Sequence, residues 1–570
     1  MNWKIIPLLL FVLACKNEPQ PILQTIPEIG LITENAMVVS ARAEASKIGS
    51  DILQKGGNAF DAMVATELAL AVVYPVAGNI GGGGFVVYRT QYGELGAFDY
   101  REKAPMAASR GMYLDSLGNY LRENSKTGSL AIGVPGTIAG VFAVHQKLGS
   151  LPMDELLAPV IELATQGFVI TEIQAQNLNH FAPIIKEVNG EESIFTKTYQ
   201  PGDTLKNLAL ANTFRRISEN GRSEFYNGET AQKLVDYLIS KGGIITMADL
   251  NAYEVELRDP IVFDYKDLKI ISMSPPSSGG ICLAQILKAL EPYPLKEYGH
   301  NSLKAIQVIT EAERRAYADR SQFLGDPDFV EIPVDTLISD AYIQRRMADF
   351  SFEKATPSSA MSYGSIEGFT EFEKESTETT HYSIVDQFGN AVAATTTLNS
   401  YFGSKVYAKE LGFFLNNEMD DFSAKPGEPN IYGLIGGDAN SIAPQKRMLS
   451  SMTPTLVEKD GKLLMTLGTP GGSTIITSVM QTILNVYEFD MNMQEAVNAP
   501  RFHHQWLPDK ILFEPNQFSA AALKELAALG YVIDEENAPV IGKVDAILIR
   551  PDGALEGGAD HRGDDTAVGY

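Results

Sequence analysis

The chain has 570 residues, of which 45% are hydrophobic and 9% aromatic, so it can bury a substantial core. Its formal net charge of −25 is spread along the sequence, and no group of Lys and Arg forms a continuous basic face. These properties describe a globular protein and argue against nucleic acid as a partner.

The N-terminus has the pattern of an export signal. A mostly apolar run from Ile5 to Ala14 is too short to cross a bilayer as a helix but suits the core of a signal peptide. The run ends in the letters VLAC, which resemble a bacterial lipobox, although Leu13 is an uncommon residue at its position. We therefore predict a signal peptide over residues 1–14, lipid on Cys15, and a location in the bacterial periplasm or cell envelope. A plain secretory signal is the alternative.

Strands and helices are expected to alternate after the signal. The sequence between Met37 and Pro75 predicts a strand, a helix, a Gly-Gly-Asn turn and a second, strongly apolar helix. The letters GNIGGGGF, residues 78–85, then form a glycine loop that leads into a strand. A dinucleotide fingerprint has the opposite order, with its glycines between a strand and a following helix, so this loop does not indicate a nucleotide site. Residues 134–349 are expected to be mainly helical.

A polar segment, residues 352–378, separates two parts of different character. It is rich in Ser, Glu and Thr and lacks apolar periodicity, so we expect a mobile surface tail. Strands dominate after it, and a further helix follows the strand KLLMTLGTP. Strands flanked by helices on both sides of this boundary predict an α/β protein whose sheets combine both parts of the chain.

A β-hairpin is expected directly after this boundary, over residues 379–399. A three-residue loop, 387–389, would place Thr379 opposite Thr397, whereas a two-residue loop would place Leu398 there. Paired threonines are common in ordinary sheets, so the hairpin alone does not establish a catalytic site.

Several motifs follow one another along nearly the whole chain after the signal. In order they are GGNAFDAMVA, GNIGGGGF, FDYREKAP, SPPSSGG, the hairpin TTHYSIVDQFGNAVAATTTLN, NNEMDDFS, LSSMTP and GTPGGS. Together they resemble the γ-glutamyltranspeptidase family, whose members are also called glutathione hydrolases. The resemblance implies an α/β (α+β) fold, a four-layer αββα sandwich of the N-terminal nucleophile hydrolase type. It also implies a precursor cut between Glu378 and Thr379 into a large subunit, 15–378, and a small catalytic subunit, 379–570, which remain together as a heterodimer.

Thr379 is the nucleophile that this resemblance implies. A hydroxyl is a poor nucleophile at neutral pH, and the α-amine freed by cleavage, with a reference pKa of about 7.7–8.0, can serve as its base. Thr379 would attack glutathione or another γ-glutamyl compound, form an ester, and pass the acyl group to water, an amino acid or a dipeptide. Thr397 would hydrogen-bond the nucleophile's hydroxyl and orient it, whereas we interpret His381 as structural support.

The resemblance also implies the groups around the nucleophile. Gly471 and Gly472 would offer backbone N–H groups to the oxyanion. A tight turn is their plain alternative, and a phosphate loop does not fit because no lysine precedes the hydroxyl residue. A γ-glutamyl group also carries an α-carboxylate and an α-ammonium, which need partners of opposite charge. The implied residues are Arg101, Ser450 and Ser451 for the carboxylate, Asp421, Asn399 and Glu418 for the ammonium, and Tyr432 in a lid over the acyl group.

Other functions remain open from the sequence. One is an acylase of the cephalosporin (glutaryl) type, against which Asp421 argues because its substrates lack the α-amino group. Another is an uncleaved lipoprotein that binds γ-glutamyl peptides without activity. We find no spacing of His, Cys or carboxylates typical of a metal site, and the inferred chemistry needs no organic cofactor.

Overall fold

The computed structural model describes residues 28–364, 379–425, 437–538 and 540–570. The predicted signal peptide, Cys15, Glu378 and Tyr432 lie outside the described residues.

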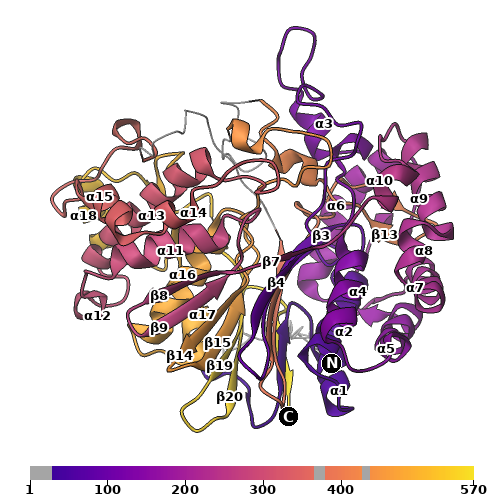
Figure 1. The fold of residues 1–570 in the computed structure, drawn as a ribbon, viewed down its shortest axis with the longest axis horizontal. Coiled ribbons are helices and arrows are strands. Elements are labelled where there is room, and N and C mark those ends of the chain that lie inside the picture. The colour runs from indigo at the N-terminus through magenta and orange to yellow at the C-terminus, as the bar shows by residue number, and fades with distance from the viewer. Residues whose placement is uncertain (1–27, 365–378, 426–436, 539) are drawn as a thin grey trace, which may run out of the picture.

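Two seven-stranded sheets lie beside each other at the centre of the molecule (Figure 1). The first, which we call the nucleophile sheet, has the order β21-β2-β10-β11-β3-β4-β7, and the second sheet has the order β1-β20-β19-β15-β14-β9-β8. All pairs within both sheets are antiparallel. The strands of the nucleophile sheet are β2 (Met37–Ser40), β3 (Gly83–Arg89), β4 (Leu95–Asp99), β7 (Glu256–Arg258), β10 (Thr380–Val385), β11 (Ala391–Thr397) and β21 (Thr566–Gly569). Those of the second sheet are β1 (Ile32–Thr33), β8 (Ile261–Tyr265), β9 (Leu268–Ser272), β14 (Thr455–Lys459), β15 (Lys462–Gly468), β19 (Asp545–Ile549) and β20 (Leu555–Ala559).

Both sheets combine strands from before and after Thr379, as the sequence predicted. In the nucleophile sheet β10 pairs with β2 and β11 pairs with β3. In the second sheet β14 pairs with β9. A cut before Thr379 would therefore leave each sheet built from two fragments.

Apolar side chains fill the space between the two sheets. Val39 and Phe85 of the nucleophile sheet belong to the same buried cluster as Ile271, Leu456 and Ile547 of the second sheet. Neighbouring positions point to the opposite face, because successive side chains of a strand alternate. The sheets therefore pack face to face, and each has a second apolar face that helices must cover.

Helices cover both outer faces and complete four αββα layers (Figure 1). On the outer side of the nucleophile sheet lie α1 (Ala43–Gln54), α2 (Ala59–Val73), α4 (Thr137–Leu148), α5 (Met153–Gln166), α6 (Glu172–Asn189), α7 (Leu208–Asn220), α8 (Arg222–Tyr226), α9 (Glu229–Ser240) and α10 (Met247–Asn251). On the outer side of the second sheet lie α11 (Gly279–Leu290), α12 (Leu295–Tyr298), α13 (Leu303–Phe323), α14 (Val334–Leu337), α15 (Asp340–Met347), α16 (Thr474–Tyr487), α17 (Met493–Asn498) and α18 (Ala520–Ala528). Among the described helices, none combines the length and the apolar character that a membrane span requires.

The start of α2 shows how the local sequence sets these elements. Asn58 accepts hydrogen bonds from the N–H groups of Phe60 and Asp61, and the Asp61 carboxylate accepts from the Asn58 N–H in return. This reciprocal cap follows the Gly-Gly-Asn turn that the sequence indicated. Every residue of α2 is buried, which explains why its sequence is apolar throughout instead of striped.

Two parts of the fold differ from the sequence prediction. The segment expected to be mainly helical also contains β7, β8 and β9. β7 pairs with the distant β4 and β9 with the distant β14, whereas β8 pairs with β9. In the expected mobile tail, residues 352–364 are docked: the Ala355 N–H donates to Leu529 O at 2.8 Å, and the Gly364 N–H donates to the Asp319 carboxylate at 2.8 Å. The expectation of a mobile tail is therefore wrong for residues 352–364. Residues 365–378 lie outside the described residues.

Candidate active site

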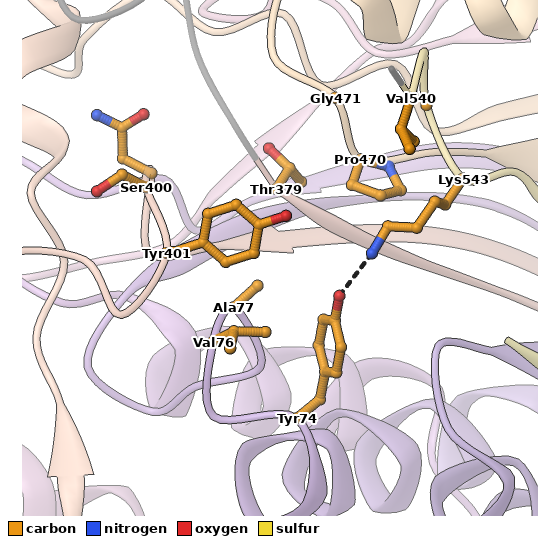
Figure 2. A pocket seen from close by; sticks show the side chains of 12 residues that line it. Tyr74, Val76, Ala77, Thr379, Ser400, Tyr401, Pro470, Gly471, Val540 and Lys543 are labelled. Carbon is orange, nitrogen blue, oxygen red and sulfur yellow. Dashed lines mark hydrogen bonds between the residues drawn. The ribbon is translucent and has the colours of Figure 1, made fainter. Parts of the chain in front are cut away.

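Thr379 lies immediately before β10 and faces a pocket. The cavity has a volume of about 100 Å³ and is lined by Gly471, which Figure 2 shows, and by Asn399 among other residues. The Thr379 hydroxyl is buried and has no hydrogen-bond partner among the residues that the structure describes. A hydroxyl that faces a cavity without an internal partner is positioned to react with something that enters the cavity.

The hairpin has the register of the three-residue loop. Thr380 pairs with Thr396 and His381 with Thr395, so Thr379 and Thr397 occupy the next opposed positions. In this continuous chain the Thr397 hydroxyl accepts a hydrogen bond from the Asn399 N–H at 2.7 Å, and its interaction with Glu418 opposes the rise in the pKa of that carboxyl group. Thr397 thus connects the position opposite Thr379 to a residue of a charged group.

The glycine loop before β3 contacts the backbone carbonyl of Thr397. Asn79 donates to Thr397 O at 2.8 Å, and a Cβ on Gly82 would lie only 2.0 Å from that same oxygen. Only glycine allows this close backbone approach without displacing β11. The loop that could suggest a nucleotide site instead positions the end of β11.

His381 is held inside the sheet. Its ring nitrogens lie 2.8 Å from Thr395 Oγ1 and 3.1 Å from Ser383 Oγ, and the side chain is fully buried. Burial lowers the pKa of His381 to about 3, so the ring is neutral at physiological pH. These contacts agree with the interpretation of His381 as structural support.

Gly471 and Gly472 form the turn between β15 and α16. Their φ angles of 137° and 62° lie in the region that favours glycine. Neither backbone N–H donates to an acceptor within the described ranges, and Gly471 lines the same pocket as Thr379 (Figure 2). The turn can therefore present unpaired N–H groups beside Thr379, which is the arrangement that an oxyanion hole requires.

A buried charged cluster adjoins Thr397, and we define it as Arg101, Glu102, Glu418 and Asp421. Arg101 follows β4, whereas Glu418 and Asp421 lie on the short helix η4 (Glu418–Asp421). Arg101 Nη1 is 2.7 Å from Glu418 Oε2 and 3.7 Å from Glu102 Oε2, and Arg101 Nη2 donates to Asp421 Oδ2. All four side chains are at most 1% exposed. The residues predicted to bind the two charges of a substrate are thus bound to each other.

Electrostatics within this cluster favours a charged arginine. Burial alone would lower the pKa of Arg101, but the carboxylates of Glu418, Asp421 and Glu102 outweigh it and raise the pKa above its usual value. Burial also raises the pKa of Glu102 and of Glu418, and Arg101 opposes this rise in both. Taking these groups out of water is unfavourable unless they stay paired, so the cluster depends on Arg101.

The predicted Ser450 and Ser451 lie on the segment that contacts Arg101. Arg101 Nη2 donates to Leu449 O at 3.4 Å, one residue before Ser450. The Ser450 hydroxyl accepts from the Met452 N–H at 3.1 Å, and Ser451 Oγ accepts from Arg320 Nη2 at 3.0 Å. Sequence reasoning missed Arg320, a buried residue of α13, because nothing in a helical pattern shows which distant serine its side chain reaches.

Sequence reasoning also missed three residues of the pocket wall, which we define as Tyr74, Tyr401 and Lys543. They line the same cavity as Thr379, and Lys543 Nζ donates to the Tyr74 hydroxyl at 2.7 Å (Figure 2). Tyr401 follows the hairpin closely in sequence, but Tyr74 and Lys543 are distant from it and no local pattern links them. Within the described ranges, no group of three or more His, Cys, Asp or Glu is arranged to hold a metal ion.

The fold and the site define a class of protein. A four-layer αββα sandwich with a threonine at the start of a central strand is the architecture of an N-terminal nucleophile hydrolase. The solved cephalosporin acylase from Bacillus halodurans has this fold: it superposes with a TM-score of 0.85 and covers 98% of this chain and 99% of its own, at 24% identity.

Sequence comparisons identify the family. The family model described as gamma-glutamyltranspeptidase matches residues 45–570. The glutathione hydrolase proenzyme of Escherichia coli (strain K12) is 46% identical over 542 residues, which cover 94% of this chain and 92% of that protein. The Acylase ACY 1 proenzyme of Pseudomonas sp. (strain V22) is 36% identical over 542 residues, 93% of each chain. The chain therefore belongs to the γ-glutamyltranspeptidase family of enzymes.

Proposed function

We propose that this chain is the precursor of a γ-glutamyltransferase that also hydrolyses glutathione, with Thr379 as the nucleophile. The observation that carries the proposal is the Thr379 hydroxyl, which faces a cavity beside the Gly471 turn and has no partner in the described part of the chain. The similarity to a glutathione hydrolase proenzyme supports the substrate class.

The first reaction is cleavage of the chain by its own hydroxyl. Thr379 Oγ1 attacks the carbonyl carbon of residue 378, and the acyl group moves from nitrogen to oxygen. Water then hydrolyses this ester, which leaves a carboxylate on residue 378 and a free α-amine on Thr379. The two fragments remain one molecule because β10 and β11 stay paired with β2 and β3.

The second reaction is acyl transfer. The freed α-amine accepts the hydroxyl proton as Thr379 attacks the γ-amide of a substrate, and the amine of the leaving group takes up a proton as it departs. The N–H groups of Gly471 and Gly472 stabilise the oxyanion, a contribution worth about 10²–10³ in rate for one such donor. Water, an amino acid or a dipeptide then accepts the γ-glutamyl group.

The buried charged cluster gives this site its preference for a glutamyl group. A substrate with both groups can replace the contact between Arg101 and Asp421. Its α-carboxylate then pairs with Arg101 and its α-ammonium pairs with Asp421, so no charge is left unpaired. A glutaryl group brings only the carboxylate. This requirement separates the proposed function from the acylase alternative, which the similarity to the Acylase ACY 1 proenzyme keeps as the second candidate.

Thr379→Ala tests the nucleophile. It should leave one band of full mature length on a denaturing gel and no hydrolysis of γ-glutamyl-4-nitroanilide, because cleavage and turnover use the same hydroxyl. Thr379→Ser is the matched control: it keeps a hydroxyl and should still be cut, at a lower rate. Two fragments split at Thr379 in the alanine variant would refute self-cleavage.

The cellular location is a separate part of the proposal. The letters VLAC support lipid on Cys15 and attachment to a membrane of the cell envelope. Cys15→Ser should move activity from the membrane fraction to the soluble fraction, as measured after cell fractionation. Wild-type activity that is already soluble would favour the plain secretory signal.

A further inference from the structure

The pocket wall is a part of the site for which the proposed mechanism has no use. Thr379 attacks, the glycine turn stabilises the oxyanion, and the buried charged cluster binds the glutamyl group. Tyr74, Tyr401 and Lys543 line the same cavity but take part in none of these steps (Figure 2). A lysine that faces a reaction pocket needs either an internal anion or an anionic ligand.

Lys543 is held in place by groups around its ammonium. Its Nζ donates to the Tyr74 hydroxyl at 2.7 Å and lies 5.3 Å from the centre of the Tyr74 ring. Its backbone N–H donates to Thr469 Oγ1 at 2.7 Å, in the strand end that precedes the Gly471 turn. Lysine has three N–H donors, and the described residues accept one of them in a hydrogen bond, so donors remain for a ligand.

The ammonium stays charged in this position. Burial alone would lower the pKa of Lys543, but its interactions with Tyr74, Asp565 and Tyr401 outweigh burial and raise the pKa above its usual value. Burial raises the pKa of Tyr74, so its hydroxyl keeps its proton and can donate it once it has accepted from Lys543.

The carboxyl group that interacts with Lys543 is itself affected by a neighbour. Asp565 helps to raise the pKa of Lys543, and burial raises the pKa of Asp565 and of the interacting Asp545. Two buried carboxyls that repel each other retain a proton, so the pair carries less than two negative charges. The positive charge of Lys543, which lines the cavity, is therefore not fully matched by internal carboxylates.

We propose that Lys543 and Tyr74 form a subsite for the carboxylate of the amino acid or short peptide that leaves, or accepts, the γ-glutamyl group. The inference rests on the proposed function, because the leaving dipeptide of glutathione and an amino acid acceptor both carry such a carboxylate. A charged N–H donor beside a neutral O–H donor suits a two-oxygen anion. The exposed ring of Tyr401, 38% accessible, offers an apolar surface beside it for the rest of the peptide.

The test compares two donors that differ in one carboxylate. Hydrolysis of γ-glutamyl-3-carboxy-4-nitroanilide and of γ-glutamyl-4-nitroanilide is measured as kcat/KM, and the ratio of the two values is the readout. A charge-assisted hydrogen bond is worth a factor of about 10 to 100, so this ratio should fall by about that factor in Lys543→Met. Lys543→Arg should restore most of it. The matched control is Lys510→Met, which removes a lysine that pairs with Asp534 and does not line the pocket.

A second comparison, between two acceptors, shows whether the bound carboxylate belongs to the leaving group or to the acceptor. Transfer to glycylglycine is compared with transfer to its C-terminal amide at a fixed concentration of γ-glutamyl-4-nitroanilide, the donor whose leaving group has no carboxylate. If the preference for glycylglycine over its amide is smaller in Lys543→Met than in the wild type, the acceptor's carboxylate binds in the subsite. If only the ratio for the two anilide donors changes, the carboxylate of the leaving group binds there.

Failure of the subsite and failure of the proposed function give different results. An equal loss on both members of each pair would overturn the subsite and make Lys543 an internal counter-ion of Asp565. Wild type without activity on γ-glutamyl-4-nitroanilide would instead remove the proposed function itself. If Lys543→Met does not fold, Tyr74→Phe carries the test, since it removes one hydroxyl and should lower the same ratio several-fold; an unchanged ratio there overturns the proposal.

Discussion

The candidate site has two sides that are built in opposite ways. One side is the buried charged cluster, whose side chains are at most 1% exposed and whose charges pair with each other. The other side is the pocket wall, which is open to solvent at Tyr401 and in which the Lys543 ammonium donates to the hydroxyl of Tyr74. A closed site with preformed pairs selects one arrangement of charges, because any ligand that lacks one charge leaves a buried group unpaired. An open wall with spare donors can accept many partners that share only a carboxylate.

The largest effect is expected from removing the guanidinium of the cluster. Arg101→Ala leaves three buried carboxyl groups without their cation and should lower the free energy of unfolding by about 3–5 kcal/mol. It should also raise KM steeply for γ-glutamyl substrates, since their α-carboxylate loses its partner. Chemical unfolding and steady-state kinetics measure the two effects.

The control for this change is a surface arginine. Arg110→Ala removes a guanidinium that is 59% exposed and pairs with Asp438, so its effect should be small. A KM for Arg101→Ala that matches the wild type would show that the cluster does not bind the substrate's carboxylate, and the contrast between the two sides would fail.

The next effect concerns the amino group of the substrate. Asp421→Asn keeps the shape of the side chain and removes its charge, so kcat/KM for γ-glutamyl-4-nitroanilide should fall about a hundredfold. Glutaryl-4-nitroanilide lacks the ammonium and should lose much less. The ratio of the two values in wild type and variant is the measurement.

A neighbouring aspartate provides the comparison for Asp421. Asp420 lies on the same short helix but accepts a hydrogen bond from Ser125 Oγ at 2.5 Å, so Asp420→Asn should change both substrates in proportion. If Asp421→Asn also gave a proportional loss, Asp421 would not recognise the ammonium, and the preference for glutamyl groups would come from elsewhere.

The smallest effect is expected at the link between the sides. Thr397→Val keeps the β-branched shape in β11 but removes the hydroxyl that accepts from the Asn399 N–H and that interacts with Glu418. Cleavage and turnover should both slow by about tenfold, while the unfolding midpoint stays near that of the wild type. Processing is followed on a gel and turnover with γ-glutamyl-4-nitroanilide. Wild-type rates for both steps would remove Thr397 from the mechanism.

The local patterns of the sequence determined much of this molecule. They predicted the β10–β11 hairpin, whose register the structure then decided in favour of the three-residue loop at 387–389, and the Gly-Gly-Asn turn before α2. The order of the motifs identified the family and, through it, the αββα class. These features are readable because periodicity, caps and turns depend on residues that are close together in the chain.

Tertiary structure alone decided which side chains meet. It paired Arg101 directly with Asp421 and Glu418, joined Arg320 to Ser451, and docked residues 352–364 that the sequence presented as a free tail. It also placed Tyr74 and Lys543 around one cavity from opposite ends of the chain. Such contacts depend on how two sheets and their helices pack, and a pairing between residues hundreds of positions apart leaves no periodic trace in a single sequence.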